Sequence, residues 1–453
     1  MISIFQTYKE HYRSNLQLAI PVVISQLGHI LVHFADSVIV GHFAGTIPLA
    51  AVSLVNSIFS VVMVIGIGIS YGITPLIAQE NGKNNLIECG KLLSNSLFIN
   101  TITGLILFLL IYFGLLASID HLDQDKAVVE QAKPFLGLLG ASIIPLMIFN
   151  TFKQFAEGLG FTKQAMIISI AGNILNVCLG IIFVKGLFGI EPMGVKGVGL
   201  STLIDRCLMA IVMGLFILNS QHFKAYLKSF NFKRIGKKRC LKILQIGAPV
   251  AMQYAFEVSA FSGAAIMMGT IGVIEQAAHQ IALNLAAMTY MMASGLSAAA
   301  TIKTGNNFGR KDFKGLQLSA NSSYHIVIVF MLLTAIVFST LRFYLPWLYT
   351  SDTSVISVAA QLLLIAAMFQ LFDGAQVVGL GILRGMGDVN IPTIITFLAY
   401  WIMGLPIAYV LGITFNWGGI GIWIGLSAGL FISALLLFRR YRIMLRRVET
   451  GIR

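Results

Sequence analysis

Charged residues are scarce in this sequence. Asp, Glu, Lys and Arg make up 11% of the 453 residues, whereas 57% are hydrophobic and the mean hydropathy is +0.85. Soluble globular proteins carry about 25% charged residues, so this composition excludes an ordinary soluble domain. The sequence predicts an integral membrane protein.

Cysteine and enzyme motifs are also missing or rare. The four cysteines show no paired or metal-type spacing, which excludes a disulfide framework. The sequence has no Walker-type phosphate loop, no metal-protease pair of histidines and no nucleophile elbow. We therefore expect no enzymatic activity and no cofactor, and we expect any active transport to be driven by an ion gradient.

Long apolar runs are the dominant feature of the chain. A membrane helix needs about 20 mostly apolar residues, whereas a membrane barrel would show alternating segments of about ten. Twelve runs meet the helical criterion, which predicts an all-α membrane protein with twelve transmembrane helices. They cover residues 15–40, 48–75, 92–118, 134–156, 164–187, 195–219, 244–269, 276–303, 321–348, 355–383, 391–414 and 418–438.

The basic residues gather on one side of these spans. With both termini on that side, it carries 25 of the 31 Lys and Arg, the other side carries five, and Arg206 lies within a span. The positive-inside rule then predicts cytoplasmic termini. The net charge of +13 is thereby explained without nucleic acid. We expect the basic stretch from Lys224 to Lys242 to be a connection near anionic lipid headgroups.

The second half of the sequence repeats the first. Ala19-Ile20-Pro21 returns as Gly247-Ala248-Pro249, 228 residues later. GISYGITPLIAQENGKN from Gly68 answers GLSAAATIKTGNNFGRK at almost the same offset. The pattern predicts two parallel six-helix repeats, an architecture common in secondary transporters. We expect an N-terminal lobe at 1–222, a basic linker at 223–243 and a C-terminal lobe at 244–453.

The first span carries a polar stripe. Gln26, His29, His33 and Asp36 are spaced 3, 4 and 3 apart, so they share one helix face. Gln26 and His29 are interpreted mainly as packing residues. An acid inside a membrane span usually marks an ion or substrate path, so we interpret Asp36 as an ion or proton site.

The seventh and tenth spans carry similar stripes. Gln253, Glu257 and Phe261 follow one another at single turns, and Phe369, Asp373 and Gln376 are spaced 4 and 3. No Lys or Arg lies in the interior of those spans, so Glu257 and Asp373 are expected to share one cation such as Na⁺, or one proton. The eighth span adds Gln280, Asn284 and Tyr290, for which packing and binding interpretations are about equally weighted. His279 is expected to be solvated.

Four segments of the sequence resemble the signature segments of the multidrug and toxic compound extrusion (MATE) family. They are AIPVVISQLGHILVHFADSVIVG, GISYGITPLIAQENG, GLSAAATIKTGNNFG and FDGAQVVGLGILRGMGD. The acids at Asp36, Glu257 and Asp373 resemble those of the NorM-like branch. The resemblance implies an antiporter of the bacterial inner membrane that exports amphipathic organic cations against Na⁺ or H⁺, acting as a monomer.

The resemblance also assigns roles to individual residues. It implies that Phe261, Gln280, Tyr290 and Ser57 line the binding region, and that Asn176 with Thr202 supports Asp36. Two positions depart from the pattern. Phe369 stands where some NorM-like members have a tyrosine near the cation, and Gly180 stands where the DinF-like branch has an aspartate. These departures weaken the assignment of Na⁺ and of an unchanged N-lobe proton site.

A second class of function fits the same architecture. Flippases of lipids or lipid-linked sugars share it, and they tend to carry several basic residues that hold phosphate in the cavity. Arg206 is the one basic residue that the sequence places in the middle of a span, away from both of its ends. Export of organic cations is therefore the preferred hypothesis.

Overall fold

The computed structural model describes residues 2–121, 125–233 and 235–450. Within these ranges the chain forms helices and no strand. Twelve of the described helical segments are long and apolar enough to span a membrane, which confirms the predicted count and fold class. Most extend beyond the predicted spans: the first span was expected at 15–40, whereas its helix is Ile2–Phe43. Arg234 and Arg453, counted among the basic residues above, lie outside the described residues.

The first six spans are built from the following segments: α1 (Ile2–Phe43), α2 (Thr46–Ser70), α3 (Ile73–Gly82), α4 (Leu86–Leu109), η1 (Leu110–Leu115), α5 (Leu116–Ser118), η2 (Ile119–His121), α6 (Lys126–Gly158), α7 (Thr162–Lys185) and α8 (Val195–Asn219). Two short segments follow, η3 (Gln221–Phe223) and α9 (Lys224–Leu227). The π-helical segment η1 continues α4, so the third span is one long rod with a local change of winding.

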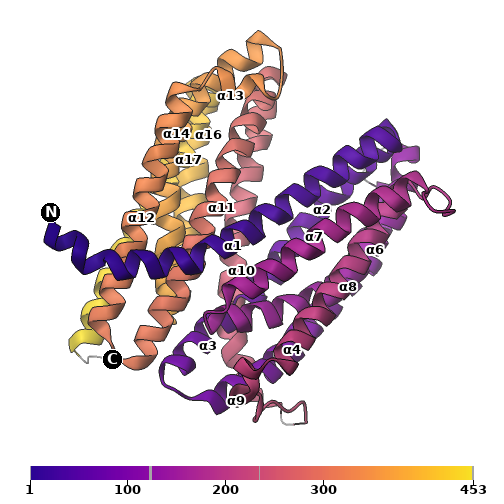
Figure 1. Ribbon diagram of the computed structural model, residues 1–453. Coiled ribbons are helices and arrows are strands. Elements are labelled where there is room, and N and C mark those ends of the chain that lie inside the picture. The colour runs from indigo at the N-terminus through magenta and orange to yellow at the C-terminus, as the bar shows by residue number, and fades with distance from the viewer. Residues whose placement is uncertain (1, 122–124, 234, 451–453) are drawn as a thin grey trace. The chain divides into compact units, whose positions relative to one another are not determined.

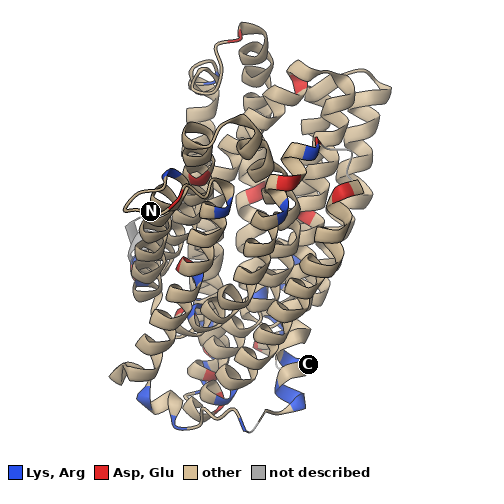
Figure 2. Cartoon of the chain, turned by 90° about the vertical axis from the view of Figure 1, so that its right-hand side faces the viewer, with Lys and Arg blue, Asp and Glu red and all other residues tan. Residues whose placement is uncertain are grey.

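The last six spans are built from α10 (Lys237–Ile271), α11 (Val273–Arg310), α12 (Phe313–Thr340), α13 (Tyr344–Trp347), α14 (Thr353–Gly385), α15 (Asn390–Phe397), η4 (Leu398–Gly404), α16 (Leu405–Tyr409), η5 (Val410–Thr414) and α17 (Gly418–Thr450). The eleventh span is the least regular, because two π-helical segments, η4 and η5, interrupt it. Figure 2 shows that charged residues are few along the helices, as their apolar composition requires.

By its internal contacts the chain divides into two compact units. Unit 1 consists of Met1–Val23 and Met252–Arg453, and unit 2 of Ile24–Ala251. The lobe boundaries drawn from the sequence, 1–222 and 244–453, remain a prediction, and the packing groups the residues differently. Two long helices, α1 and α10, each give one part of their length to each unit.

The two points at which α1 and α10 pass from one unit to the other are related by the sequence repeat. The breaks after Val23 and after Ala251 are separated by 228 residues, the offset found between Pro21 and Pro249. Both prolines lie inside their helices, two residues before the break. An interior proline lacks an N–H donor and clashes with the preceding turn, which locally weakens a helix. The repeat therefore extends from the sequence to the way the units exchange helix segments.

Glycines allow the exchanged segments to pack closely. A Cβ at Gly72 would lie 2.7 Å from the carbonyl oxygen of Ile243, so that contact in unit 2 requires glycine. In unit 1, a Cβ at Gly295 would lie 3.1 Å from the carbonyl oxygen of Ala19. Gly72 thus allows the first part of α10 to pack closely in unit 2, and Gly295 allows the first part of α1 to pack closely in unit 1.

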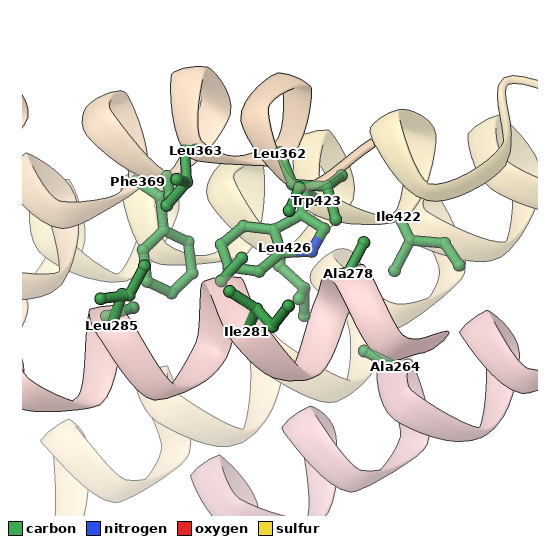
Figure 3. Packing of buried hydrophobic residues seen from close by; sticks show 14 of the residues in the cluster. Ala264, Ala278, Ile281, Leu285, Leu362, Leu363, Phe369, Ile422, Trp423 and Leu426 are labelled. Atoms are coloured by element: carbon green, nitrogen blue, oxygen red, sulfur yellow. The ribbon is translucent and has the colours of Figure 1, made fainter. Parts of the chain in front are cut away.

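Each unit has its own packed interior. In unit 2, α6 packs against α8, α2 and α4, and in unit 1, α14 packs against α11, α17 and α12 (Figure 1). Unit 1 contains an apolar cluster in which Phe369, Trp423, Leu362 and Ile281 meet (Figure 3). These side chains are almost completely buried, so they fix the positions of α11, α14 and α17.

Candidate functional site

Two acidic side chains meet inside unit 1. Glu257 lies on α10 and Asp373 on α14, and they are 7% and 4% exposed. The two carboxyl groups lie within electrostatic reach of each other. Among the described residues, no hydrogen-bond partner faces Asp373 Oδ1. The structure thus brings together the pair expected from the seventh and tenth spans.

Two tyrosines lie near this pair, and a third lies beside one of them. Tyr290 of α11 and Tyr400 of η4 both lie within electrostatic reach of Glu257 and Asp373, and Tyr254 lies near Tyr290. Tyr290 was expected at the site, whereas Tyr254 and Tyr400 were missed. Tyr254 precedes Glu257 by three residues, so helical spacing was the available signal. Tyr400 is in a different span and carried no such signal.

Amide and aromatic groups complete the unit 1 site. Gln376 Nε2 donates to the Tyr400 hydroxyl at 2.8 Å, and both side chains are buried. Phe261 packs edge-on against Tyr400 and Phe369, with ring centroids 6.1 and 6.0 Å apart. Phe261 and Gln376 therefore both contact Tyr400, which lies within electrostatic reach of the acids, and their roles at the site stay predictions.

Phe369 also belongs to the interior of unit 1. It is 2% exposed and its ring centroid lies 5.4 Å from that of Trp423. Figure 3 shows the two rings side by side among aliphatic residues of α11, α14 and α17. Phe369 thus joins the site to the apolar cluster, and its role in substrate binding stays a prediction.

Two residues predicted to bind substrate are exposed. Gln280 Nε2 donates to Asn284 Oδ1 at 3.0 Å on the surface of α11. Ser57, in unit 2, donates to the backbone oxygen of Ser53 one turn away. No described contact links Gln280 or Ser57 to the side chains around Glu257. Their roles in substrate binding stay predictions.

Unit 2 buries acids beside a base. Asp36 and Asp205 are 5% and 4% exposed, and both lie within electrostatic reach of Arg206. The Arg206 guanidinium donates to Ser142 Oγ at 2.7 Å and lies 5.4 Å from the centre of the Phe59 ring. The sequence had singled out Arg206 as a basic residue inside a span and had given Asp205 no role. Three charged groups of α1 and α8 in fact form one cluster.

The residues predicted to support Asp36 are also placed in unit 2. Asn176 Nδ2 donates to Thr202 Oγ1 at 3.2 Å in the interior, so the structure pairs these two side chains. Gln26 is half-buried on α1, ten residues before Asp36. Whether the three act on Asp36 stays a prediction.

Two further buried bases were missed because the sequence placed them near span ends. Lys153 is 6% exposed, lies 4.0 Å from Glu157 and donates to Ser25 Oγ at 3.2 Å, all within unit 2. Arg384 is 8% exposed and donates to Gln253 Oε1 at 3.4 Å in unit 1. Membrane-end position alone does not tell whether such a side chain faces lipid headgroups or folds inward.

The expectation for His279 was wrong. It is 1% exposed, and its Nδ1 accepts a hydrogen bond of 3.1 Å from Trp423 Nε1. Its position near a helix start suggested solvent, but α17 covers it. His279 is a packing residue of the apolar cluster in unit 1.

No group of three or more His, Cys, Asp or Glu side chains with metal-site geometry occurs in the described part of the chain. The Glu257 and Asp373 pair offers two carboxylates, with amide and phenol oxygens nearby. Oxygen donors of this kind suit hard cations such as Na⁺ or a proton, and do not suit the softer transition metals. The site fits a transported ion better than a resident metal.

Comparison with known proteins identifies relatives of the chain. It is 33% identical over 441 residues to the "Multidrug resistance protein NorM" of Photobacterium profundum, covering 96% of both chains. Among solved structures it resembles a MATE protein in a bent conformation, with a TM-score of 0.90, 20% identity and 97% of both chains covered. It also resembles a MOP superfamily transporter from Pyrococcus furiosus, with a TM-score of 0.85, 20% identity and 97% coverage of both chains.

The MatE family model matches the chain twice, at residues 21–182 and 249–410. The two matches begin at Pro21 and Pro249 and are equal in length, so they coincide with the repeat found in the sequence. Together with twelve membrane-spanning helices, they account for most of the chain. The protein is a multi-pass membrane protein that belongs to the MATE family of transporters, in its NorM-like branch.

Proposed function

We propose that this protein is a secondary active antiporter that exports amphipathic organic cations in exchange for Na⁺ or H⁺ by alternating access. The relative from Photobacterium profundum is named a multidrug resistance protein, which supports a broad range of exported compounds. The family is one of transporters, and the chain carries no recognisable enzyme motif.

One observation carries the proposal. Asp373 lies within electrostatic reach of Glu257, and none of the ion pairs found among the described residues joins either acid to a Lys or Arg. Two buried carboxyl groups without a base strongly favour the uptake of a positive charge, because burial and mutual repulsion both penalise two bare anions. A metal cation, a proton or a cationic substrate would each relieve that penalty, and competition among them gives antiport.

The surrounding rings support cationic and amphipathic substrates. Tyr290 and Tyr400 lie within electrostatic reach of the acids, and Phe261 packs against Tyr400. Aromatic faces attract cations and also provide apolar contact area that does not depend on one substrate shape. Gln280, Ser57, Phe369 and Gln376 complete the proposed substrate-binding set.

Asp36 is proposed as a second ion site, in unit 2. One of its carboxyl oxygens has no hydrogen-bond partner among the described residues, although Arg206 lies within electrostatic reach. Asn176, Thr202 and Gln26 are proposed to support it. Because Arg206 already balances part of its charge, Asp36 is expected to bind a cation less strongly than the Glu257 and Asp373 pair.

We further propose that the protein acts as a monomer in the bacterial inner membrane with cytoplasmic termini. The distribution of Lys and Arg supports that orientation. The flippase alternative gains little from the two buried bases of unit 2. Lys153 lies 4.0 Å from Glu157, and Arg206 lies near Asp36 and Asp205, so neither carries an uncompensated positive charge for a phosphate.

The test is efflux from proteoliposomes loaded with ethidium. Glu257→Gln and Asp373→Asn are each expected to abolish efflux driven by an imposed ion gradient. Glu449→Gln, which neutralises an exposed acid at the end of α17, is the matched control and should transport normally. Normal gradient-driven efflux by both site variants would refute the proposal.

The coupling ion is tested separately. A Na⁺ gradient imposed at constant pH, and a pH gradient imposed without Na⁺, are applied to the same vesicles. Efflux driven by one gradient alone identifies the ion. Efflux that responds to neither gradient, in protein that still binds ethidium, would exclude antiport.

A further inference from the structure

An apolar groove opens on unit 1 between α1, α11 and α12. Its volume is about 470 Å³. Leu16 and Ile20 line it from α1, and Val329 and Leu333 line it from α12. All four are exposed to the surroundings, with Val329 and Leu333 each 58% exposed. In a membrane-spanning helix bundle, such a surface faces the hydrocarbon of the bilayer.

One end of the groove is polar. Tyr12 and His325 line it there, and the Tyr12 hydroxyl is hydrogen-bonded to His325 Nδ1 at 2.9 Å. Tyr8 stacks on Tyr12 and packs edge-on against His325, with centroid distances of 5.8 and 5.2 Å. Clusters of tyrosine with a polar tip are typical of the headgroup level of a bilayer. The groove therefore runs from the headgroup region into the hydrocarbon.

The polar end is also basic. Lys9, Arg13, Leu16 and Ile20 are spaced 4, 3 and 4 apart, so they form one stripe along α1. The first two continue the groove-lining face beyond its apolar part, and both are exposed. Lys303 lies within electrostatic reach of the neighbouring His11 and adds positive charge at this end. The opposing acids are Glu10, on the same turn of α1, and Asp312, which also lies within electrostatic reach of His11.

We propose that this groove binds one anionic phospholipid, with an acyl chain between α1 and α12 and its phosphate at Arg13, Lys9 and the Tyr12–His325 pair. The volume of the groove and the basic residues at its polar end both favour an anionic phospholipid. The volume falls in the range of about 300–1,000 Å³ that is usual for small-molecule sites. Basic residues at a membrane surface favour anionic over zwitterionic headgroups.

The site has a structural consequence for α1. Residues up to Val23 pack in unit 1, and residues from Ile24 pack in unit 2. The bound lipid would contact the part of α1 that belongs to unit 1, where Asn15 is buried. Asn15 Nδ2 already donates to Ser322 and Ser323 of α12 at 2.7 and 2.9 Å. The lipid and this hydrogen-bond group together would hold the first part of α1 on α12.

Native mass spectrometry of the full-length protein in detergent tests the proposal. Delipidated protein is titrated with phosphatidylglycerol or with phosphatidylcholine of identical acyl chains. We expect one tightly retained phosphatidylglycerol and weaker retention of phosphatidylcholine. Equal retention of the two lipids would overturn the proposal, and so would a dimer in place of a lipid adduct.

Two pairs of variants locate the lipid. Val329→Trp fills the groove and should abolish the retained lipid, whereas Ile336→Trp, at a position of 60% exposure on the same helix that does not line the groove, should keep it. Arg13→Gln should weaken the binding of phosphatidylglycerol about fivefold, since one basic residue near an anionic headgroup contributes about that factor to the affinity. Arg446→Gln, at an exposed site on α17, should change nothing. Retention by Val329→Trp equal to that of Ile336→Trp would disprove the site.

Discussion

The buried acidic side chains of unit 1 and of unit 2 have different neighbours. In unit 2, Asp36 and Asp205 lie near Arg206, and Glu157 lies 4.0 Å from Lys153. In unit 1, Glu257 and Asp373 lie near each other, with tyrosines around them. These buried acids of unit 2 lie near Arg206 or Lys153, whereas no ion pair among the described residues joins Glu257 or Asp373 to a Lys or Arg, which is why we propose that a cation binds there.

The repeat shows that these charges are not part of the common scaffold. Glu257 corresponds to His29 at the offset of 228, and Asp36 corresponds to Ala264. Ala264 is completely buried in the apolar cluster of unit 1 (Figure 3). The position of Asp36 thus carries an apolar residue in unit 1, and the position of Glu257 carries a histidine in unit 2. A fold can be shared while the sites on it differ.

Transferring the unit 2 acid to unit 1 should have the largest effect. Ala264→Asp would place a carboxyl group in a packed apolar interior, and we expect a loss of about 4 kcal/mol or more in stability. Thermal unfolding in detergent measures it. Ala264→Asn, of nearly the same size, separates the cost of charge from that of volume. Equal losses for both variants would mean that charge is irrelevant there.

Removing the base of unit 2 should come next. Arg206→Met would leave Asp36 and Asp205 buried without their positive neighbour, at a cost of about 3 kcal/mol in stability. The double variant Arg206→Met with Asp205→Asn should recover part of the loss, because it removes one of the uncompensated acids. Arg206→Lys is the control that keeps the charge. A double variant less stable than the single one would contradict internal charge balance in unit 2.

A smaller effect is expected at the hydrogen bond between Gln376 and Tyr400. Gln376→Leu would leave the buried Tyr400 hydroxyl without this donor, at a cost of about 2 kcal/mol. Tyr400→Phe removes the other partner and should cost about the same or less. Ethidium affinity, measured by fluorescence, should fall in both variants if Tyr400 must be held beside the acids. An unchanged affinity would place Tyr400 outside the substrate contacts.

The smallest effects are expected at two ion pairs, one in each unit. Arg440 and Asp388 of unit 1 are 2.6 Å apart with side chains 19% and 9% exposed, whereas Arg239 and Glu88 of unit 2 are 2.6 Å apart and 31% and 25% exposed. Since exposed pairs contribute about 1 kcal/mol or less, Asp388→Asn should cost about 1 kcal/mol and Glu88→Gln less than that. Double-mutant cycles measure both. The reverse order would argue against burial as the cause.

Much of this organisation was predictable from the sequence. Apolar runs predicted twelve spans, and the recurrence of Pro21 at Pro249 predicted the repeat, because both depend on local composition. Helix spacing grouped Phe261 with Glu257 and Gln376 with Asp373, and the structure places both Phe261 and Gln376 at Tyr400. Periodicity within one helix was sufficient for those residues.

Contacts between distant helices could not be read in the same way. Tyr400 lies in a span disturbed by π-helical turns, and only packing places it beside Gln376. The sequence position of His279 suggested contact with solvent, but Trp423 of α17 covers it in the structure. Lys153 and Arg384 lie near span ends, where a long side chain can turn either toward headgroups or inward, and the sequence does not record that choice.

The division of α1 between the two units sets an order for assembly during synthesis. Unit 2 contains residues 24–251, so all its parts have been made once Ala251 leaves the ribosome. Unit 1 needs Met1–Val23 together with Met252–Arg453. The first part of α1 must therefore wait for later helices of unit 1, such as α12, before it reaches its packed position. A shortened N-terminus would thus damage the unit that is completed last, the one that carries Glu257 and Asp373.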